Sequence, residues 1–94
     1  MSLVITPAIR AKLHHKHHVD EEEILQAFAN RELGFLIDTR EVHRTEPPTE
    51  WFIAETDKGR KLKICFVYRE GDIHIKSAYS PSQVVIDLYE RHAR

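Results

Sequence analysis

The chain of 94 residues carries 14 lysines and arginines against 15 aspartates and glutamates, a formal net charge of −1. This length favours a single domain over residues 1–94 and leaves no room for a second catalytic domain or a large cofactor fold. With 41% apolar and 31% charged residues, the composition is typical of a globular domain and argues against a disordered tail.

The first predicted helix starts at Thr6, because a threonine followed by proline is typical of a helix N-terminus. We expect it to run to Lys16 or His17. A second helix is predicted after Asp20, since Asp20 and Glu23 have the spacing of a capping box, and it ends near Asn30.

Strand-like segments follow at 34–38, weakly at 40–45, and then at 51–56, 62–68 and 73–79. Residues 57–60 and the pair Glu70-Gly71 are predicted turns. A last helix is expected to start at Ser80, with Val84, Val85, Leu88 and Tyr89 on its inner side. This order predicts an α+β fold with two N-terminal helices, an antiparallel sheet of three to four strands and a C-terminal helix.

The hairpin at the end of the predicted sheet gathers positive charge. Six lysines and arginines lie between Lys58 and Lys76 against two acids, a local excess of +4. A two-residue turn would pair Cys65 with Lys76 and place Lys63 and His74 on the same face, whereas strict alternation places Tyr79 on the apolar face. This basic face could hold a phosphate backbone. The alternative is a solvated face whose lysines protect a sheet edge.

Other patterns allow two interpretations each. The histidine run at 14–18 could hold a metal ion or could favour a helix C-terminus through its charge, and we expect no metal site. Cys65 is either a reactive thiol or a small apolar residue within a strand. Trp51 and Phe52 stack a base or anchor a loop to the core. His43, beside two arginines, suits proton transfer or is merely exposed.

Targeting and cofactor motifs are absent from the sequence. No apolar run reaches the roughly 20 residues of a transmembrane helix, and the N-terminal residues lack the pattern of a signal peptide. The single cysteine excludes an intrachain disulfide and indicates a reducing compartment. No glycine-rich phosphate loop or nucleophile elbow occurs. We therefore expect a cytoplasmic protein without cofactor or membrane contact.

Lys16-His17-His18-Val19, followed by an acidic helix and Phe28, is similar to an opening motif K-H-G-V…F. Gly59-Arg60-Lys61-Leu62 and the segment 73–79 resemble a hairpin motif G-R-x-L…R-I-I-S-A-R. Through these two segments the chain resembles the BrnT-like toxin family, some of whose members carry the name ADP-ribosyl-(dinitrogen reductase) hydrolase. His74 and Tyr79 stand where the family has arginines, and His18 stands at a helix-ending glycine. True hydrolases of that name are much longer helical proteins, so the chain is too short for their fold.

The resemblance implies a RelE-like fold, a metal-independent endoribonuclease of a type II toxin-antitoxin system, and a ribbon-helix-helix antitoxin as partner. RNA cleavage needs an acid, a base and cations around the phosphate. We assign His74, Lys63, Lys76 and Tyr79 as catalytic residues, and Arg60, Lys61, Arg40 and His43 as RNA-binding residues. The alternative is an inactive binding module of the same fold, since two family arginines are missing. The other partner that we consider is a second copy of the same chain, in a homodimer.

Overall fold

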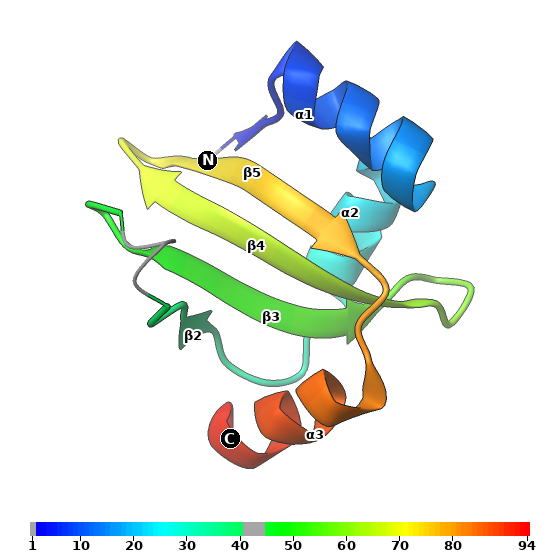
Figure 1. Ribbon diagram of the computed structural model, residues 1–94, viewed down its shortest axis with the longest axis vertical. Helices are drawn as coiled ribbons and strands as arrows, with labels where there is room; N and C mark the ends of the chain where they lie inside the picture. The colour runs from blue at the N-terminus through cyan, green and yellow to red at the C-terminus, as the bar shows by residue number, and fades with distance from the viewer. Residues whose placement is uncertain (1, 41–44) are drawn as a thin grey trace.

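A computed structural model describes residues 2–40 and 45–94 as an α+β fold, which confirms the predicted class (Figure 1). The elements in chain order are β1 (Leu3–Val4), α1 (Pro7–Lys12), the π-helical turn η1 (Leu13–His17), α2 (Glu21–Ala29), β2 (Leu36–Ile37), β3 (Thr49–Glu55), β4 (Lys61–Arg69), β5 (Asp72–Tyr79) and α3 (Gln83–His92). No helix within the described residues has the length and apolar content needed to cross a membrane.

The five strands form one mixed sheet in the order β1-β5-β4-β3-β2. The expected sheet of three to four antiparallel strands was therefore too small. The missed strand, β1, pairs in parallel with β5, with Leu3 opposite Ile73. Two residues are too short to show a period-two pattern, so only the tertiary pairing reveals this strand. At the other edge, the expected strand 34–38 shortens to the two residues of β2.

Side-chain caps start the first two helices as predicted. Thr6 Oγ1 accepts a hydrogen bond from the Ile9 amide at 3.3 Å. Asp20 Oδ1 accepts from the Glu23 amide at 2.9 Å, and Glu23 Oε1 accepts from the Asp20 amide at 3.2 Å. This reciprocal pair is the capping box, which satisfies two amides that the helix itself leaves unpaired.

The turn between β4 and β5 has the two residues predicted, with positive φ at Glu70 (52°) and Gly71 (83°). Beyond the turn, the pairing of β4 with β5 differs from the predicted one, because the register shifts between Cys65 and Phe66. Cys65 lies opposite Ser77, and Lys76 is the extra residue of a β-bulge. Beyond the bulge, each side chain of β5 lies on the face opposite to the one that strict alternation predicts. Tyr79 therefore lies opposite Lys63 and shares its face, which corrects the predicted placement of Tyr79 on the apolar face.

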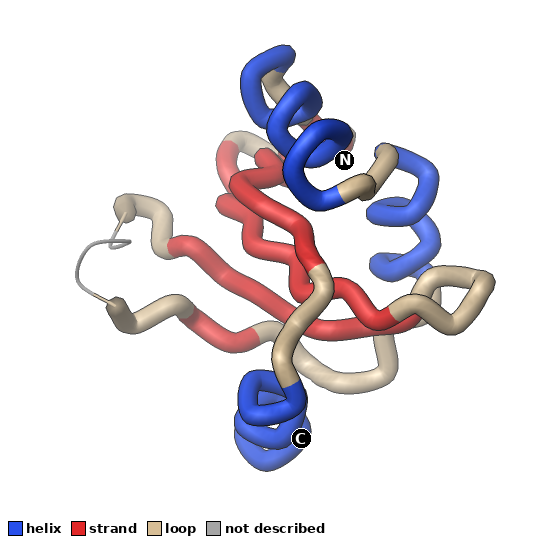
Figure 2. Tube along the Cα trace, turned by 45° about the vertical axis from the view of Figure 1, so that its right-hand side comes forward, coloured by secondary structure: helices blue, strands red, loops and turns tan. Residues whose placement is uncertain are grey.

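The two faces of the sheet carry different helices (Figures 1 and 2). Phe28 of α2 packs on one face, with its ring centroid 4.6 Å from that of Phe52 and 5.6 Å from that of Phe66. Tyr89 of α3 packs on the other face, 5.6 Å from the ring of Trp51. Both strand aromatics are buried, so Trp51 and Phe52 anchor β3 in the core. Because α3 lies near β3, it leaves the β5 side of its face uncovered.

Helix α3 starts later than predicted. Its N-cap is Ser82, whose Oγ accepts from the Val85 amide at 3.4 Å, and the expected cap at Ser80 is wrong. The expected inner face was also partly wrong, since Val84 is 77% and Leu88 43% exposed. The contact of Tyr89 with Trp51 fixes the rotation of the helix. The Tyr89 hydroxyl donates a hydrogen bond to the Gly34 carbonyl at 2.7 Å, which stabilises the same orientation of the helix.

Candidate functional site

A cleft of about 480 Å³ crosses the sheet face that α3 leaves uncovered. We name it the basic cleft, and it is lined by Lys12, Lys16, His17, Asp38, Arg40, Thr45, Thr49, Cys65, Lys76, Ser77 and Tyr79. Four cationic side chains against one carboxylate leave +3, counting histidine as neutral. In a chain of net charge −1 this concentration of positive charge favours anionic ligands.

One wall of the basic cleft comes from the π-helical turn η1. Its carbonyl at Leu13 accepts from the amides of His18 and Val19, the second at 3.0 Å, and His18 takes a left-handed conformation with φ 53°. Such a turn widens the helix and rotates the side chains at its end. His17, the last residue of η1, is only partly exposed and faces Tyr79. Its ring centroid lies 5.6 Å from the Tyr79 ring.

The charge state of His17 is set by its surroundings. Burial lowers the pKa of His17 below the usual 6.5, and the cations of Lys16, Lys12 and Arg60 lower it further. Protonation would place another positive charge in a partly dehydrated, already basic environment. His17 is therefore neutral at pH 7 and can accept a proton there.

The opposite wall carries an ion pair between Arg40 and Asp38. The Arg40 guanidinium donates to both oxygens of the carboxylate, at 3.1 and 2.8 Å, and the Arg40 amide donates at 3.0 Å. The hydrogen bond to Asp38 raises the pKa of Arg40. This bidentate pair cancels the one negative charge of the cleft lining and fixes the direction of Arg40. The remaining positive charge of the lining comes from three lysines that form no ion pair within residues 2–40 and 45–94, namely Lys12, Lys16 and Lys76.

Lys63 lies against aromatic rings beside the cleft. Its Nζ is 4.6 Å from the Trp51 ring centroid and 5.7 Å from that of Tyr79. The residue is buried, so the two rings replace part of the water shell of the ammonium group. Cys65, opposite Trp51 and Ser77, is buried as a strand residue but borders the cleft.

The structure gathers only part of the residues predicted for the site. Lys76, Tyr79 and Arg40 line the basic cleft, and Lys63 adjoins it through Tyr79. His74 lies opposite Val67 on the same face but is not part of the lining. Lys61 lines a different cavity, and the guanidinium of Arg60 binds protein groups instead of facing the cleft. His43 lies outside the described residues.

His17, with Lys12 and Lys16 beside it, is the part of the site that the sequence reasoning missed. The signal was present, because His17 lies in the histidine run and in the Lys16-His17-His18-Val19 motif. The run was interpreted as a helix end or a pair of metal ligands. The direction of each histidine depended on the π-helical turn, which no pattern in the sequence indicates. Among the described residues, no group of three or more histidine, cysteine or acidic side chains is placed to hold a metal ion.

Two other cavities within the described residues have different chemistry. One of about 570 Å³ between α3 and the end of β3 is lined by four acids and Lys61 (Glu32, Glu55, Asp57 and Glu90 are the acids). One of about 490 Å³ beside α1 is mostly apolar, with Ile5, Leu13 and Val19 in its wall. Neither of them combines several lysines with a histidine, as the basic cleft does.

No protein-family model, curated protein or solved structure matches the chain.

Proposed function

We propose that the protein is a metal-independent endoribonuclease that cuts single-stranded RNA in the basic cleft, as the toxin of a cytoplasmic toxin-antitoxin pair. The observation that carries this proposal is the pair of His17 and Tyr79 inside the cleft. A histidine with a lowered pKa lies 5.6 Å, ring to ring, from a phenol, and the same cleft is lined by three lysines that have no acidic partner in the part of the chain that the structure describes. This combination supplies a proton acceptor, a proton donor and cations without a metal ion.

The chemistry follows from these groups. His17 takes the proton of a ribose 2′-hydroxyl, whose oxygen attacks the adjacent phosphorus. The bond from phosphorus to the 5′-oxygen breaks, and the Tyr79 hydroxyl gives its proton to that leaving oxygen. Lys12, Lys16 and Lys76 stabilise the extra negative charge on the phosphate oxygens during the reaction. The products carry a 2′,3′-cyclic phosphate and a 5′-hydroxyl, and DNA is not cut because it has no 2′-hydroxyl.

His17 takes the role that the sequence assigned to His74. Both side chains belong to the same face of the molecule, but only His17 lines the cleft and contacts Tyr79. Lys63 keeps a supporting role in this proposal, since its ammonium group lies against the Tyr79 ring and favours negative charge near the phenol oxygen.

The test is cleavage of a fluorescently labelled single-stranded RNA by the purified chain in EDTA, with an all-deoxy strand of the same sequence beside it. His17→Ala should lower the rate by about 10²–10⁴-fold, as expected when a proton-transfer group is lost. His15→Ala is the matched control, because His15 is an exposed residue of the same turn that does not line the cleft. Its rate should equal that of the unchanged chain.

Three outcomes separate the proposals. Cleavage that depends on His17 and on the 2′-hydroxyl supports the endoribonuclease. Binding of RNA without cleavage supports the inactive binding module, and absence of both refutes an RNA function. The toxin role is tested by inducible expression in bacteria, where growth arrest must be abolished by His17→Ala and relieved by co-expression of the neighbouring antitoxin gene.

A further inference from the structure

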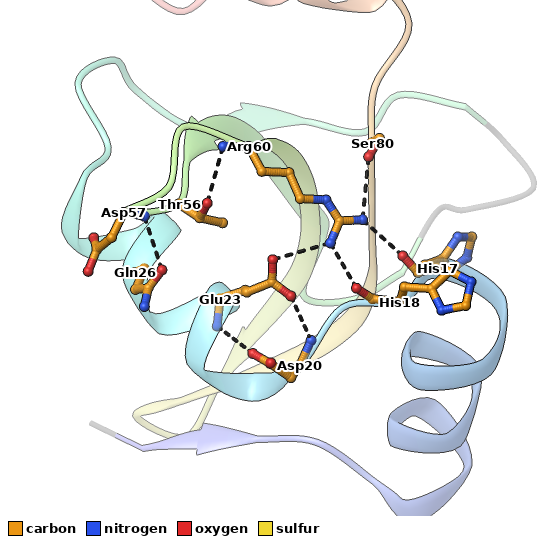
Figure 3. A network of polar contacts seen from close by, with 9 residues as sticks. All are labelled: His17, His18, Asp20, Glu23, Gln26, Thr56, Asp57, Arg60 and Ser80. Carbon is orange, nitrogen blue, oxygen red and sulfur yellow. Dashed lines mark hydrogen bonds and ion pairs between the residues drawn. The ribbon is translucent and has the colours of Figure 1, made fainter.

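The Arg60 side chain connects three segments that are distant in sequence (Figure 3). Its Nη1 donates to the His18 carbonyl at 2.8 Å and to Glu23 Oε2 at 3.2 Å. Its Nη2 donates to the His17 carbonyl at 2.9 Å and lies 3.5 Å from Ser80 Oγ. The guanidinium group therefore has four protein acceptors, and its side chain is 32% exposed.

Two of the four acceptors are backbone carbonyls at the end of a helical turn. The carbonyls of His17 and His18 lie at the C-terminal end of η1, where a helix leaves its last carbonyls unpaired and its dipole favours a cation. Glu23 is held at both oxygens, because Oε1 completes the capping box of α2 while Oε2 binds Arg60. Arg60 itself is held at its amide, which donates to Thr56 Oγ1 at 3.2 Å.

These contacts fix the backbone next to both members of the His17–Tyr79 pair. One carbonyl belongs to His17 itself, and Ser80 directly follows Tyr79. Arg60 nevertheless does not line the basic cleft. We infer that Arg60 is a positioning residue of the proposed ribonuclease reaction, which holds the His17 ring at the distance from Tyr79 that proton transfer requires. This inference rests on the proposed function.

The competing role is the one that the sequence assigned, direct binding of the RNA backbone. The two roles differ in what they change. A positioning residue affects kcat, since a misplaced proton acceptor slows the chemical step while the cleft still binds RNA. The loss of a phosphate-binding residue raises KM and lowers the salt dependence of binding.

The experiment compares Arg60→Gln and Arg60→Lys with the unchanged chain, using Arg10→Gln as the matched control. Arg10 also forms an ion pair at a helix start, with Glu21 at 2.8 Å, but it does not contact His17. We expect Arg60→Gln to lower kcat by about 10²-fold with an unchanged KM. Arg60→Lys, which keeps the charge and can reach one carbonyl, should recover part of the rate. Arg10→Gln should leave kcat and KM unchanged.

A second readout follows the His17 ring by NMR without RNA. The charged groups around this ring are Lys12, Lys16 and His18 from its own segment and Arg60, with the phenol of Tyr79 from β5. Removing the Arg60 cation and loosening the turn both raise the pKa of His17, so Arg60→Gln must shift the pH profile of kcat and the His17 titration to higher pH. Measurements are made well below the melting temperature of each variant, so that a loss of stability alone does not lower kcat.

The outcomes are distinct. A raised KM with unchanged kcat, or a His17 titration that Arg60→Gln leaves unaltered, overturns the positioning role. If Arg60→Gln does not fold, Arg60→Lys decides by the same two readouts. If the unchanged chain cuts no RNA, the proposed function fails and the catalytic part of this inference fails with it. The His17 titration of Arg60→Lys still decides whether Arg60 orders His17, because this variant keeps the cation and changes only the contacts to the turn.

Discussion

The salt dependence of RNA binding tests the charge of the basic cleft directly. Asp38 already neutralises Arg40, so the lysines at 12, 16 and 76 are the cationic side chains of the lining without an acidic partner among the described residues. Each phosphate neutralised on a single strand contributes about −0.7 to the slope of log affinity against log salt. Three lysines therefore predict a slope of about −2. Raising KCl from 50 to 200 mM should then weaken binding by about 20-fold.

The assay is fluorescence anisotropy of labelled single-stranded RNA with His17→Ala, which binds the strand without cutting it. Adding Lys76→Gln should reduce the slope by about 0.7. Lys58→Gln is the matched control, since Lys58 is an exposed lysine of the β3–β4 turn that does not line the cleft. A slope near zero, or an equal effect of Lys58→Gln and Lys76→Gln, would refute the assignment of the cleft.

Four further predictions concern stability and catalysis. The pKa of His17 is lower in the folded chain than in the unfolded chain, so stability is full above about pH 6.5 and falls as the pH drops below it. The melting temperature should therefore decrease below this pH. His17→Gln should make the melting temperature depend less on pH. Tyr89→Phe removes the hydrogen bond to the Gly34 carbonyl and should destabilise by about 1 kcal/mol in urea denaturation, with the Trp51 contact kept. Asp20→Ala removes the capping box and should lower the free energy of unfolding by about 1 kcal/mol, whereas Glu22→Ala, in the same turn without a capping bond, should not. Tyr79→Phe should slow RNA cleavage while leaving RNA affinity unchanged, because it removes only the proposed proton donor.

Local features were predictable because they depend on neighbours in the chain. The caps at Thr6 and Asp20 and the turn at Glu70-Gly71 each follow from a few adjacent residues, and each is confirmed. Strand alternation did not decide which predicted residues line the cleft, because Lys76 is the bulge residue and Arg40 lies outside the strands, whereas His74 keeps its predicted pairing with Val67. Lys76 and Arg40 do line the cleft, whereas His74 lies outside it and Arg60 faces the end of η1.

The sequence by itself determined the α+β class, the helix starts at Thr6 and Asp20 and the positive charge of the last hairpin, because these depend on residue types and short spacings. The tertiary structure decided which of these residues share a site. The bulge at Lys76 turned Tyr79 to the face of Lys63, and the π-helical turn directed His17 toward it. A one-residue shift in a strand reverses the directions of its side chains, and an extra residue in a helical turn rotates them, while the local composition stays unchanged. Their outcome depends on packing against segments that are distant in the sequence, such as His17 and Tyr79, which are 62 residues apart, and no local pattern records it.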